Sequence, residues 1–297
     1  MIEKYPEKPY KYPIDIELSS RCGLNCIWCI HHTIKNQWDL TLENFRKILQ
    51  FIQYNKNDIV YISFAWIGES LLNKDILLIL DELKELPDIF LLIPTKGWRW
   101  LTDDIIIKIQ ELRDYWININ LQLWLYSLRE KIVNHMYWWT YWSVNHYADL
   151  IDSIKRMKSL KFDFCLELLL TKYSKEEVPS FKKFCDTLWV EWVVHRLHNF
   201  WWKLENYESL YTAWETDPYH DYNGMCGFKP FFTWNWEVTA GTFCSHYNFW
   251  NVDKYTYSWG MIDILNQCYD TIRLDNEYCK KCDDNILNVR WNRIEKT

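Results

Sequence analysis

Glycine is scarce in this chain, which contains 7 glycines in 297 residues. Average usage of about 7% would give roughly 20. Long basic runs are also missing, and the formal net charge is −6. Proteins that grip a nucleic acid backbone usually present a basic face, so we expect no nucleic acid partner.

Long hydrophobic runs are missing as well, although 49% of the residues are apolar. A membrane-spanning helix needs about 18 or more consecutive apolar residues, and no such run occurs. The first ten residues lack the apolar core of a signal peptide. We therefore expect a cytoplasmic protein without membrane contact. The apolar content is sufficient for one large domain and a small appendage.

Short apolar runs alternate with amphipathic stretches over the first two thirds of the chain. Expected strands cover 14–18, 59–64, 90–95, 117–125, 164–171 and 190–197. Expected helices cover 41–54, 74–86, 102–112, 146–160 and 175–188, the first of them capped by Thr41.

The order of these elements predicts an α/β fold. Six strands, each but the last followed by a helix, imply a parallel sheet built from βα units. Length and order favour a partial (β/α)6 barrel. An open doubly wound sheet is the alternative, because periodicity alone does not separate the two.

The alternation stops after about residue 205. Residues 206–297 are richer in aromatic and turn residues and contain five of the ten cysteines. Within them, 231–234 and 237–242 are typical of a hairpin. We predict a barrel domain over 1–205 and a small Cys-rich α+β domain over 206–297, in which metal ligation substitutes for a core.

The strongest motif is a cysteine triplet just after the first expected strand. Its sequence is Cys22-Gly-Leu-Asn-Cys26-Ile-Trp-Cys29. Three thiolates can hold three irons of a [4Fe–4S] cube and leave the fourth iron open to a ligand, whereas an electron-transfer cluster normally uses four cysteines. The position suits chemistry, since barrel active sites lie at the C-terminal ends of strands. Zinc, or a cluster completed by a distant cysteine, is the alternative.

The triplet resembles that of the radical S-adenosylmethionine (SAM) superfamily in its spacing, in the strand before it and in the aromatic residue before the third cysteine. The resemblance implies that SAM binds the open iron through its amino and carboxylate groups. It also implies an electron donor such as flavodoxin or ferredoxin, which reduces the cluster. SAM is then cleaved to methionine and a 5′-deoxyadenosyl radical, which abstracts hydrogen from the substrate.

Two further segments resemble family motifs at strand ends. The segment 67–70, which contains Gly68 and Glu69, resembles the Gly-Gly-Glu-Pro motif that lines the SAM amino group. A turn of small residues and a carboxylate for an ammonium are the physical reason for such a motif. Residues 95–97, Thr-Lys-Gly, resemble a Thr-Asn-Gly segment of the family.

Two single residues extend this resemblance. Ser127 closes the fourth expected strand, where the family often has a polar residue near SAM. Arg196 closes the sixth and either pairs with the SAM carboxylate, which suits a guanidinium, or lies at the surface. His31 and His32 follow the triplet, and we expect both in an exposed turn. We expect the isolated Cys165 and Cys185 to be buried apolar residues.

A second cysteine group lies near the C-terminus. Two separated pairs, Cys226 with Cys244 and Cys279 with Cys282, resemble the ligands of a Twitch domain, the shorter relative of the SPASM domain. The resemblance implies an auxiliary [4Fe–4S] cluster on these four residues. Cys268, the fifth cysteine of this region, is then not a ligand. Structural zinc is the alternative.

The sequence therefore favours a radical SAM oxidoreductase or peptide-modifying enzyme that acts on a peptide or a small molecule. The auxiliary cluster would accept the electron released when a substrate radical is oxidised. Two alternatives are a non-enzymatic iron–sulfur or zinc-binding interaction protein and an RNA-modifying radical SAM enzyme. The acidic charge balance argues against the latter.

Tryptophan is as abundant as glycine is scarce, with 20 residues. Trp66 lies where the SAM-binding turn of the family has glycine, and Trp236 lies at the tip of the expected hairpin. Hairpin-tip positions often need φ > 0, which tryptophan adopts poorly. Our hypothesis is that some Trp positions are UGA codons read as glycine in the source organism. The alternative is that they are real and supply an aromatic substrate surface.

Overall fold

The computed structural model describes residues 12–29, 31, 34, 36–65, 68–97, 100–137, 145–196, 231–232, 237–239 and 248–251. The described strands are β1 (Tyr12–Ile16), β2 (Ile59–Ser63), β3 (Phe90–Thr95), β4 (Asn118–Trp124), β5 (Phe164–Leu170), β6 (Glu191–Arg196), β7 (Phe231–Phe232), β8 (Glu237–Thr239) and β9 (Asn248–Asn251). The described α-helices are α1 (Leu42–Tyr54), α2 (Ile76–Glu82), α3 (Asp103–Asp114), α4 (Glu130–Met136), α5 (His146–Ser159) and α6 (Val178–Leu188).

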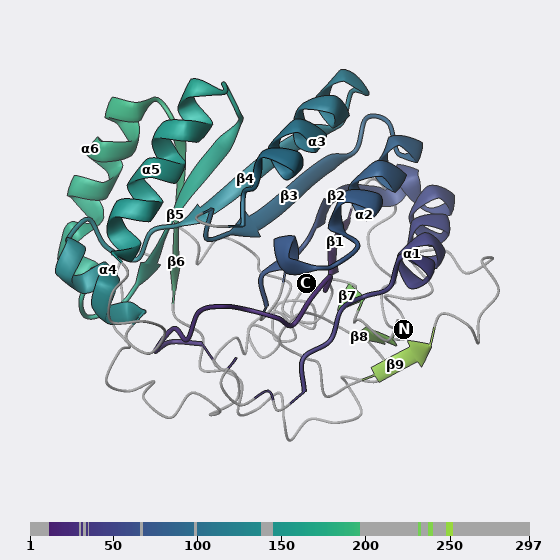
Figure 1. Cartoon of the computed structure of the whole chain (residues 1–297), viewed down its shortest axis with the longest axis horizontal. Helices are drawn as coiled ribbons and strands as arrows, with labels where there is room; N and C mark the ends of the chain where they lie inside the picture. The colour runs from purple at the N-terminus through teal and green to yellow at the C-terminus, as the bar shows by residue number, and fades with distance from the viewer. Residues whose placement is uncertain are drawn as a thin grey trace, which may run out of the picture.

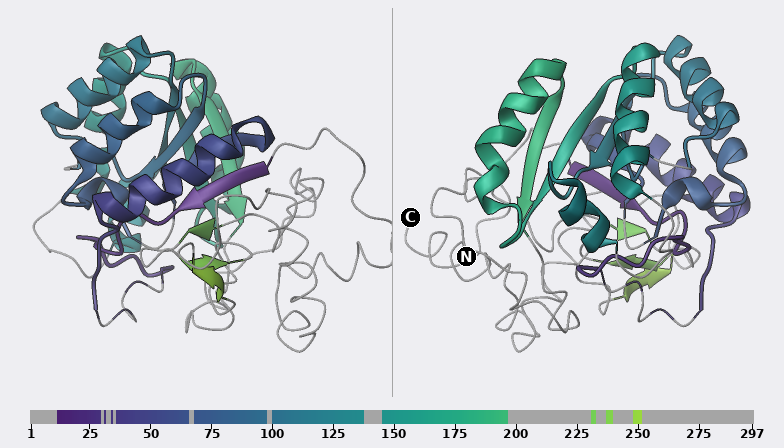
Figure 2. Two further views of the ribbon diagram at one scale, coloured as in Figure 1. Left: turned by 90° about the vertical axis from the view of Figure 1, so that its right-hand side faces the viewer. Right: turned by 60° about the vertical axis from the view of Figure 1, so that its left-hand side comes forward.

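Strand order separates the two folds that the sequence left open. The described strands form one sheet in the order β6-β5-β4-β3-β2-β1-β7-β8-β9, and β1 to β6 pair in parallel. A doubly wound sheet reverses its direction at an internal switch point, with helices on both faces. Here the first six strands follow one another in chain order, and helices α1, α2, α3, α5 and α6 lie along the same face (Figures 1 and 2). This winding is that of the predicted (β/α)6 unit.

The face beneath these helices, here called the outer face, is apolar. Ile14, Ile62, Leu91 and Ile119 are partners in register across the first four strands, and none is more than 3% exposed. The outer face also includes Phe232, whose ring lies 5.4 Å from that of Phe51 in α1. Burial of these side chains drives the helices onto the sheet. Residues of the opposite face, here called the inner face, are treated below.

Side-chain caps explain where several helices begin. As predicted, Thr41 caps α1, and its Oγ1 accepts a hydrogen bond from the Asn44 N–H at 3.2 Å. Thr102 and Asn145 cap α3 and α5 in the same way. Each cap satisfies a backbone donor that the first turn leaves free. The sequence analysis did not predict α4, a short helix between β4 and α5.

The expected C-terminal hairpin is confirmed where the structure describes it. Strand β7 pairs antiparallel with β8, and β7 also pairs in parallel with β1. The hairpin therefore extends the same sheet. The five cysteines beyond residue 205 lie outside the described residues, and the division into two domains stays a prediction. Among the described residues, no helix has the length and apolarity to span a bilayer.

Two tryptophans adopt the left-handed conformation that normally favours glycine. Trp116 has φ 63° and follows α3, while Trp189 has φ 55° and follows α6. Both sit in Schellman motifs, in which the next residue bonds back to the helix, Ile117 N–H to Leu112 and Val190 N–H to Cys185. Their side chains are 81% and 90% exposed. The left-handed conformation costs a non-glycine residue about 1–2 kcal/mol, so both positions extend the hypothesis that some tryptophans are glycine.

We expect the source DNA to carry UGA at codons 116 and 189, and also at codons 66 and 236, which lie outside the described residues. Peptide mass spectrometry of protein purified from its source should then find glycine at these positions. Lys161 is the control, because it adopts the same conformation, with φ 56°, without being a tryptophan. UGG codons together with tryptophan masses would exclude the hypothesis.

Candidate active site

The three cysteines of the triplet lie on the loop after β1, at the C-terminal edge of the parallel sheet. All three are free thiols, and Cys26 is buried while Cys22 and Cys29 are partly buried. The loop is held by its backbone, as the Ile27 N–H donates to the Met136 carbonyl at 3.0 Å. The His31 N–H lies 3.4 Å from the Cys29 Sγ, a contact suited to a sulfur that carries negative charge.

Burial sets the acidity of these thiols. It raises the pKa of Cys22 to about 12 and the pKa of Cys26 and Cys29 above the usual thiol value. Without a ligand the three groups are therefore protonated thiols. Metal binding would displace their protons, because the thiolate is the ligating form.

The donor set fits a cubane. The thiols of Cys22, Cys26 and Cys29 lie close enough together to influence one another's pKa. In a cubane each thiolate binds a different iron, so three thiols on one loop suit it.

A close backbone approach positions the turn after β2 against the cysteine loop. The Glu69 N–H donates to the Arg21 carbonyl at 2.8 Å. A Cβ placed on Gly68 would lie 2.0 Å from the Ser19 carbonyl oxygen, closer than any side chain allows. Glycine is thus required at 68 by the approach of two backbones. The neighbouring Trp66 and Ile67 lie outside the described residues.

Glu69 places a buried carboxylate beside the triplet. Its side chain is 3% exposed, and Oε2 accepts a hydrogen bond from the Lys96 N–H at 3.1 Å. Oε1 has no hydrogen-bond partner among the described residues. Burial raises the pKa of Glu69 to about 7, and hydrogen bonds from Lys96 and Thr95 oppose this rise. A buried acceptor without a donor among the described residues fits an N–H donor such as the amino group of SAM.

Lys96, at the end of β3, brings a cation to the same region. Its ammonium donates to the Tyr126 hydroxyl and lies 5.0 Å from the ring centroid of Trp28 and 4.3 Å from that of Tyr126. Burial lowers the pKa of Lys96, while the thiols and Glu69 oppose this change. The sequence analysis identified residues 95–97 only as a motif and did not predict a role for Lys96.

The two remaining predicted cofactor contacts have different environments. Ser127 is fully buried, and its hydroxyl lies 2.7 and 2.8 Å from the carboxylate oxygens of Glu177. Glu177 also accepts hydrogen bonds from the Leu128 N–H and the Arg129 guanidinium, so this cluster fixes the segment after β4. A role for Ser127 in SAM binding stays a prediction. Arg196 ends β6, but its side chain lies outside the described part of the chain.

Sequence reasoning missed the residues that hold the cysteine loop. The Asn73 side chain donates to the carbonyls of Leu18 and Leu40, and Arg21 forms an ion pair with Asp39 at 2.8 Å. These are contacts between distant residues, which local spacing does not reveal. The exposed turn expected at His31 is wrong, because this residue is 9% exposed and its Nε2 lies 2.9 Å from the Ser20 carbonyl oxygen.

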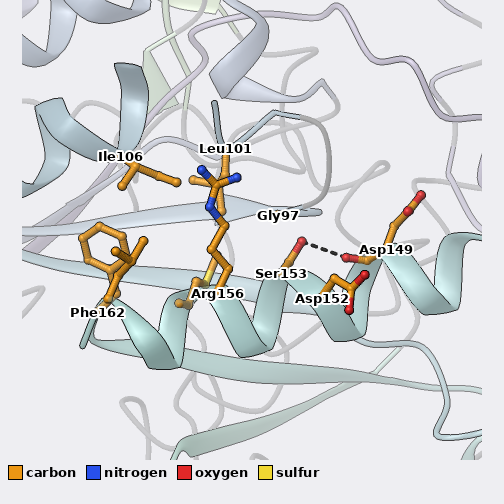
Figure 3. Close-up of a pocket in the computed structure, with 10 residues that line it drawn as sticks. Gly97, Leu101, Ile106, Asp149, Asp152, Ser153, Arg156 and Phe162 are labelled. Atoms are coloured by element: carbon orange, nitrogen blue, oxygen red, sulfur yellow. Dashed lines mark hydrogen bonds between the residues drawn. The ribbon is translucent and has the colours of Figure 1, made fainter. Parts of the chain in front are cut away.

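A separate hollow of about 300 Å³ lies between α5 and the segment after β3 (Figure 3). Asp149, Ser153 and Arg156 of α5 line it, and the Ser153 hydroxyl donates to the Asp149 carbonyl of its own helix. Neither the three cysteines nor Glu69 contribute to its lining. This hollow is therefore separate from the cysteine loop.

Comparison with known proteins identifies the family of the chain. A family model described as "Radical SAM superfamily" matches residues 16–185. No curated protein gives a significant match. The structure of Streptococcus suis SuiB bound to precursor peptide SuiA aligns with a TM-score of 0.64 at 15% identity, covering 92% of this chain and 70% of SuiB.

Two other solved structures are similar. Native anSMEcpe with bound AdoMet and Kp18Cys peptide aligns with a TM-score of 0.63 at 15% identity, covering 91% of this chain and 86% of the other. BtrN in complex with AdoMet and 2-DOIA aligns with a TM-score of 0.55 at 16% identity, covering 91% and 88%. At these identities the likeness shows the fold.

Proposed function

The chain belongs to the radical SAM superfamily, and from this premise we propose that it cleaves SAM reductively and abstracts hydrogen from a peptide or small-molecule substrate. Cys22, Cys26 and Cys29 would hold the [4Fe–4S] cluster. When bound, this cofactor supplies the electron that converts SAM to methionine and a 5′-deoxyadenosyl radical. The chain's own residues bind and orient SAM and keep water from the radical.

The observation that carries this proposal is the buried Oε1 of Glu69, which has no donor among the described residues and lies in the turn packed on the cysteine loop. An N–H of the SAM amino group would satisfy that atom, while the backbone approach at Gly68 holds the carboxylate in place. Lys96 N–H fixes the other carboxylate oxygen, so Glu69 has one orientation. Gly68, Glu69, Ser127 and Arg196 are the proposed SAM contacts.

The finer assignments belong to the same proposal. A peptide substrate is supported by the SuiA and Kp18Cys peptides bound to two structures of the same fold. A small molecule remains the other candidate. We assign an auxiliary [4Fe–4S] cluster of Twitch/SPASM type to Cys226, Cys244, Cys279 and Cys282, which would assist substrate oxidation. A flavodoxin or ferredoxin would act as the reductant of this cytoplasmic oxidoreductase.

The proposal is tested by anaerobic reconstitution followed by reduction with dithionite in the presence of SAM. We expect 5′-deoxyadenosine and methionine to form in equal amounts. Tight zinc binding without iron uptake, or a reduced cluster that leaves SAM intact, would contradict the proposal.

Replacing Glu69 with glutamine should weaken SAM binding and leave the iron content unchanged. The change removes a charge-assisted hydrogen bond between the carboxylate and the SAM amino group, which costs roughly 1.5–3 kcal/mol. Titration calorimetry with SAM measures the loss. Glu176→Gln, an exposed carboxylate on the segment before α6, is the control and should bind SAM normally. An unchanged affinity in Glu69→Gln would show that Glu69 does not contact SAM.

The same assay tests the role of Glu69 through pH. Because burial raises its pKa to about 7, this group is largely protonated below that pH. SAM binding requires the carboxylate, which is only half formed at the pKa of about 7, so the affinity should rise with pH through about 7 and become constant about one pH unit higher. The Glu69→Gln variant should lose this dependence. A wild-type affinity that does not change between about pH 6 and about pH 8 would contradict the assignment.

A further inference from the structure

Three aromatic rings surround the ammonium of Lys96. Its Nζ lies 5.0 Å from the ring centroid of Trp28, 4.8 Å from that of Trp124 and 4.3 Å from that of Tyr126. These three rings, here called the aromatic cage, also pack on one another, with centroid distances of 5.1, 5.8 and 6.4 Å. Ring faces attract a cation, and the attraction is stronger where water is excluded. The aromatic cage therefore stabilises a positive charge at a fixed position.

The aromatic cage brings this charge to the cysteine loop. Trp28 lies in that loop, between Cys26 and Cys29. Trp124 ends β4 on the inner face of the sheet, because it alternates with the outer-face residues of that strand. The Tyr126 side chain is buried, and its hydroxyl accepts a hydrogen bond from the ammonium. The cation is thus held where the inner face meets the loop that carries the three cysteines.

This charge has no anionic partner in the described part of the chain. There the ammonium donates only to the neutral Tyr126 hydroxyl. Glu69 bonds to the backbone N–H of Lys96, not to its ammonium. Proteins seldom withdraw a charge from water without pairing it. An anion that binds beside the aromatic cage would supply the missing partner.

The charge of Lys96 acts on all three thiols of the triplet. Burial raises the pKa of Cys22, Cys26 and Cys29, and Lys96 opposes this rise at each of them. Iron binding would convert the thiols to thiolates, and reduction would add one more negative charge to the same group. A cation at a fixed position stabilises the more negative of two states more strongly.

From this geometry we propose that Lys96 raises the reduction potential of the cluster on the cysteine triplet. One electron passes from a reduced donor such as flavodoxin or ferredoxin to the cluster, the donor is oxidised, and the added negative charge is stabilised by the ammonium. Lys96 acts through its charge and makes or breaks no bond, while the aromatic cage fixes its position. The inference rests on the proposed function and adds to it the residue that favours reduction.

The test is a redox titration of the reconstituted full chain without SAM, in which electron paramagnetic resonance measures the reduced cluster. The relevant signal is the one that the triple alanine variant of Cys22, Cys26 and Cys29 lacks. Lys96→Met removes the charge and keeps a long side chain. It should make the equilibrium constant for reduction smaller by about tenfold or more, which lowers the potential by about 59 mV for one electron. Lys96→Arg keeps the charge and should restore most of this loss.

Lys182 offers a matched control. Its ammonium also lies over a tryptophan, 4.6 Å from the ring centroid of Trp192, but on α6 and β6. Lys182→Met should therefore leave the potential unchanged. An unchanged potential in Lys96→Met overturns the inference, and so does a Lys96→Arg variant whose potential is as low. Weaker SAM binding in Lys96→Met at an unchanged potential also overturns it, and assigns the ammonium to the SAM carboxylate instead.

A second uncharged variant guards against loss of the fold. Iron content and circular dichroism report whether Lys96→Met assembles, and Lys96→Gln should lower the potential in the same way. Failure of the proposed function is distinguishable, because it is seen in wild type as a missing cluster or as SAM that stays intact, and the inference then fails with it. A wild-type chain that cleaves SAM, with a potential that does not depend on Lys96, contradicts this inference alone.

Discussion

Replacing Cys22, Cys26 and Cys29 together with alanine should reduce the iron content of the reconstituted chain from about eight to about four atoms, because one cube loses all its protein ligands. SAM cleavage should disappear completely. The three thiols lie on one loop beside Glu69 and influence one another's pKa. The other described cysteines, Cys165 and Cys185, lie on β5 and α6, so no other described cysteine replaces the three.

Cys185→Ala is the matched control for this result. Cys185 is a fully buried thiol of α6, and burial raises its pKa to about 12. It behaves as a small apolar residue, as predicted, so its loss should leave iron content and SAM cleavage unchanged. Iron analysis and chromatography of 5′-deoxyadenosine provide the two measurements. Retained SAM cleavage in the triple variant would show that the cysteine loop does not hold the catalytic cluster.

The fold was largely predictable because its signals are local. Each expected strand overlaps an observed one, since a buried parallel strand is a short apolar run that needs no distant information. The cap at Thr41 was found for the same reason, as one side chain bonds a donor three residues away. Helix α4 was missed because it has only seven residues, too few for a clear helical period.

The candidate site was predictable only in part. The cysteine spacing and Glu69 follow from motifs, but their supports are long-range contacts, such as Asn73 to Leu18 and Ser127 to Glu177. The position of Glu167 on the inner face could not be predicted for a further reason. Its strand, β5, is buried at every position, so the sequence does not distinguish its two faces. Only the register with β4 and β6 assigns Glu167 to the inner face.

Replacing any one of Cys226, Cys244, Cys279 and Cys282 with alanine should stop turnover of the native substrate, while SAM cleavage without substrate should persist at least in part. The four cysteines lie outside the described residues, so this prediction follows from the resemblance of their arrangement to a Twitch domain. The first cluster has three ligands of its own and would not need them. A domain of fewer than about 100 residues often depends on metal ligation for its fold, so losing one ligand should loosen it.

The pattern of iron loss distinguishes this reading from its alternatives. Each single variant should lose up to about four irons and keep the cluster on Cys22, Cys26 and Cys29, because the two ligand sets are separate. Cys268→Ala is the control and should retain full activity. If Cys268→Ala alone abolishes turnover, the ligand set is wrong. If the four variants process substrate at the parent rate, the second cluster is dispensable, and the C-terminal region supports the fold without taking part in the reaction.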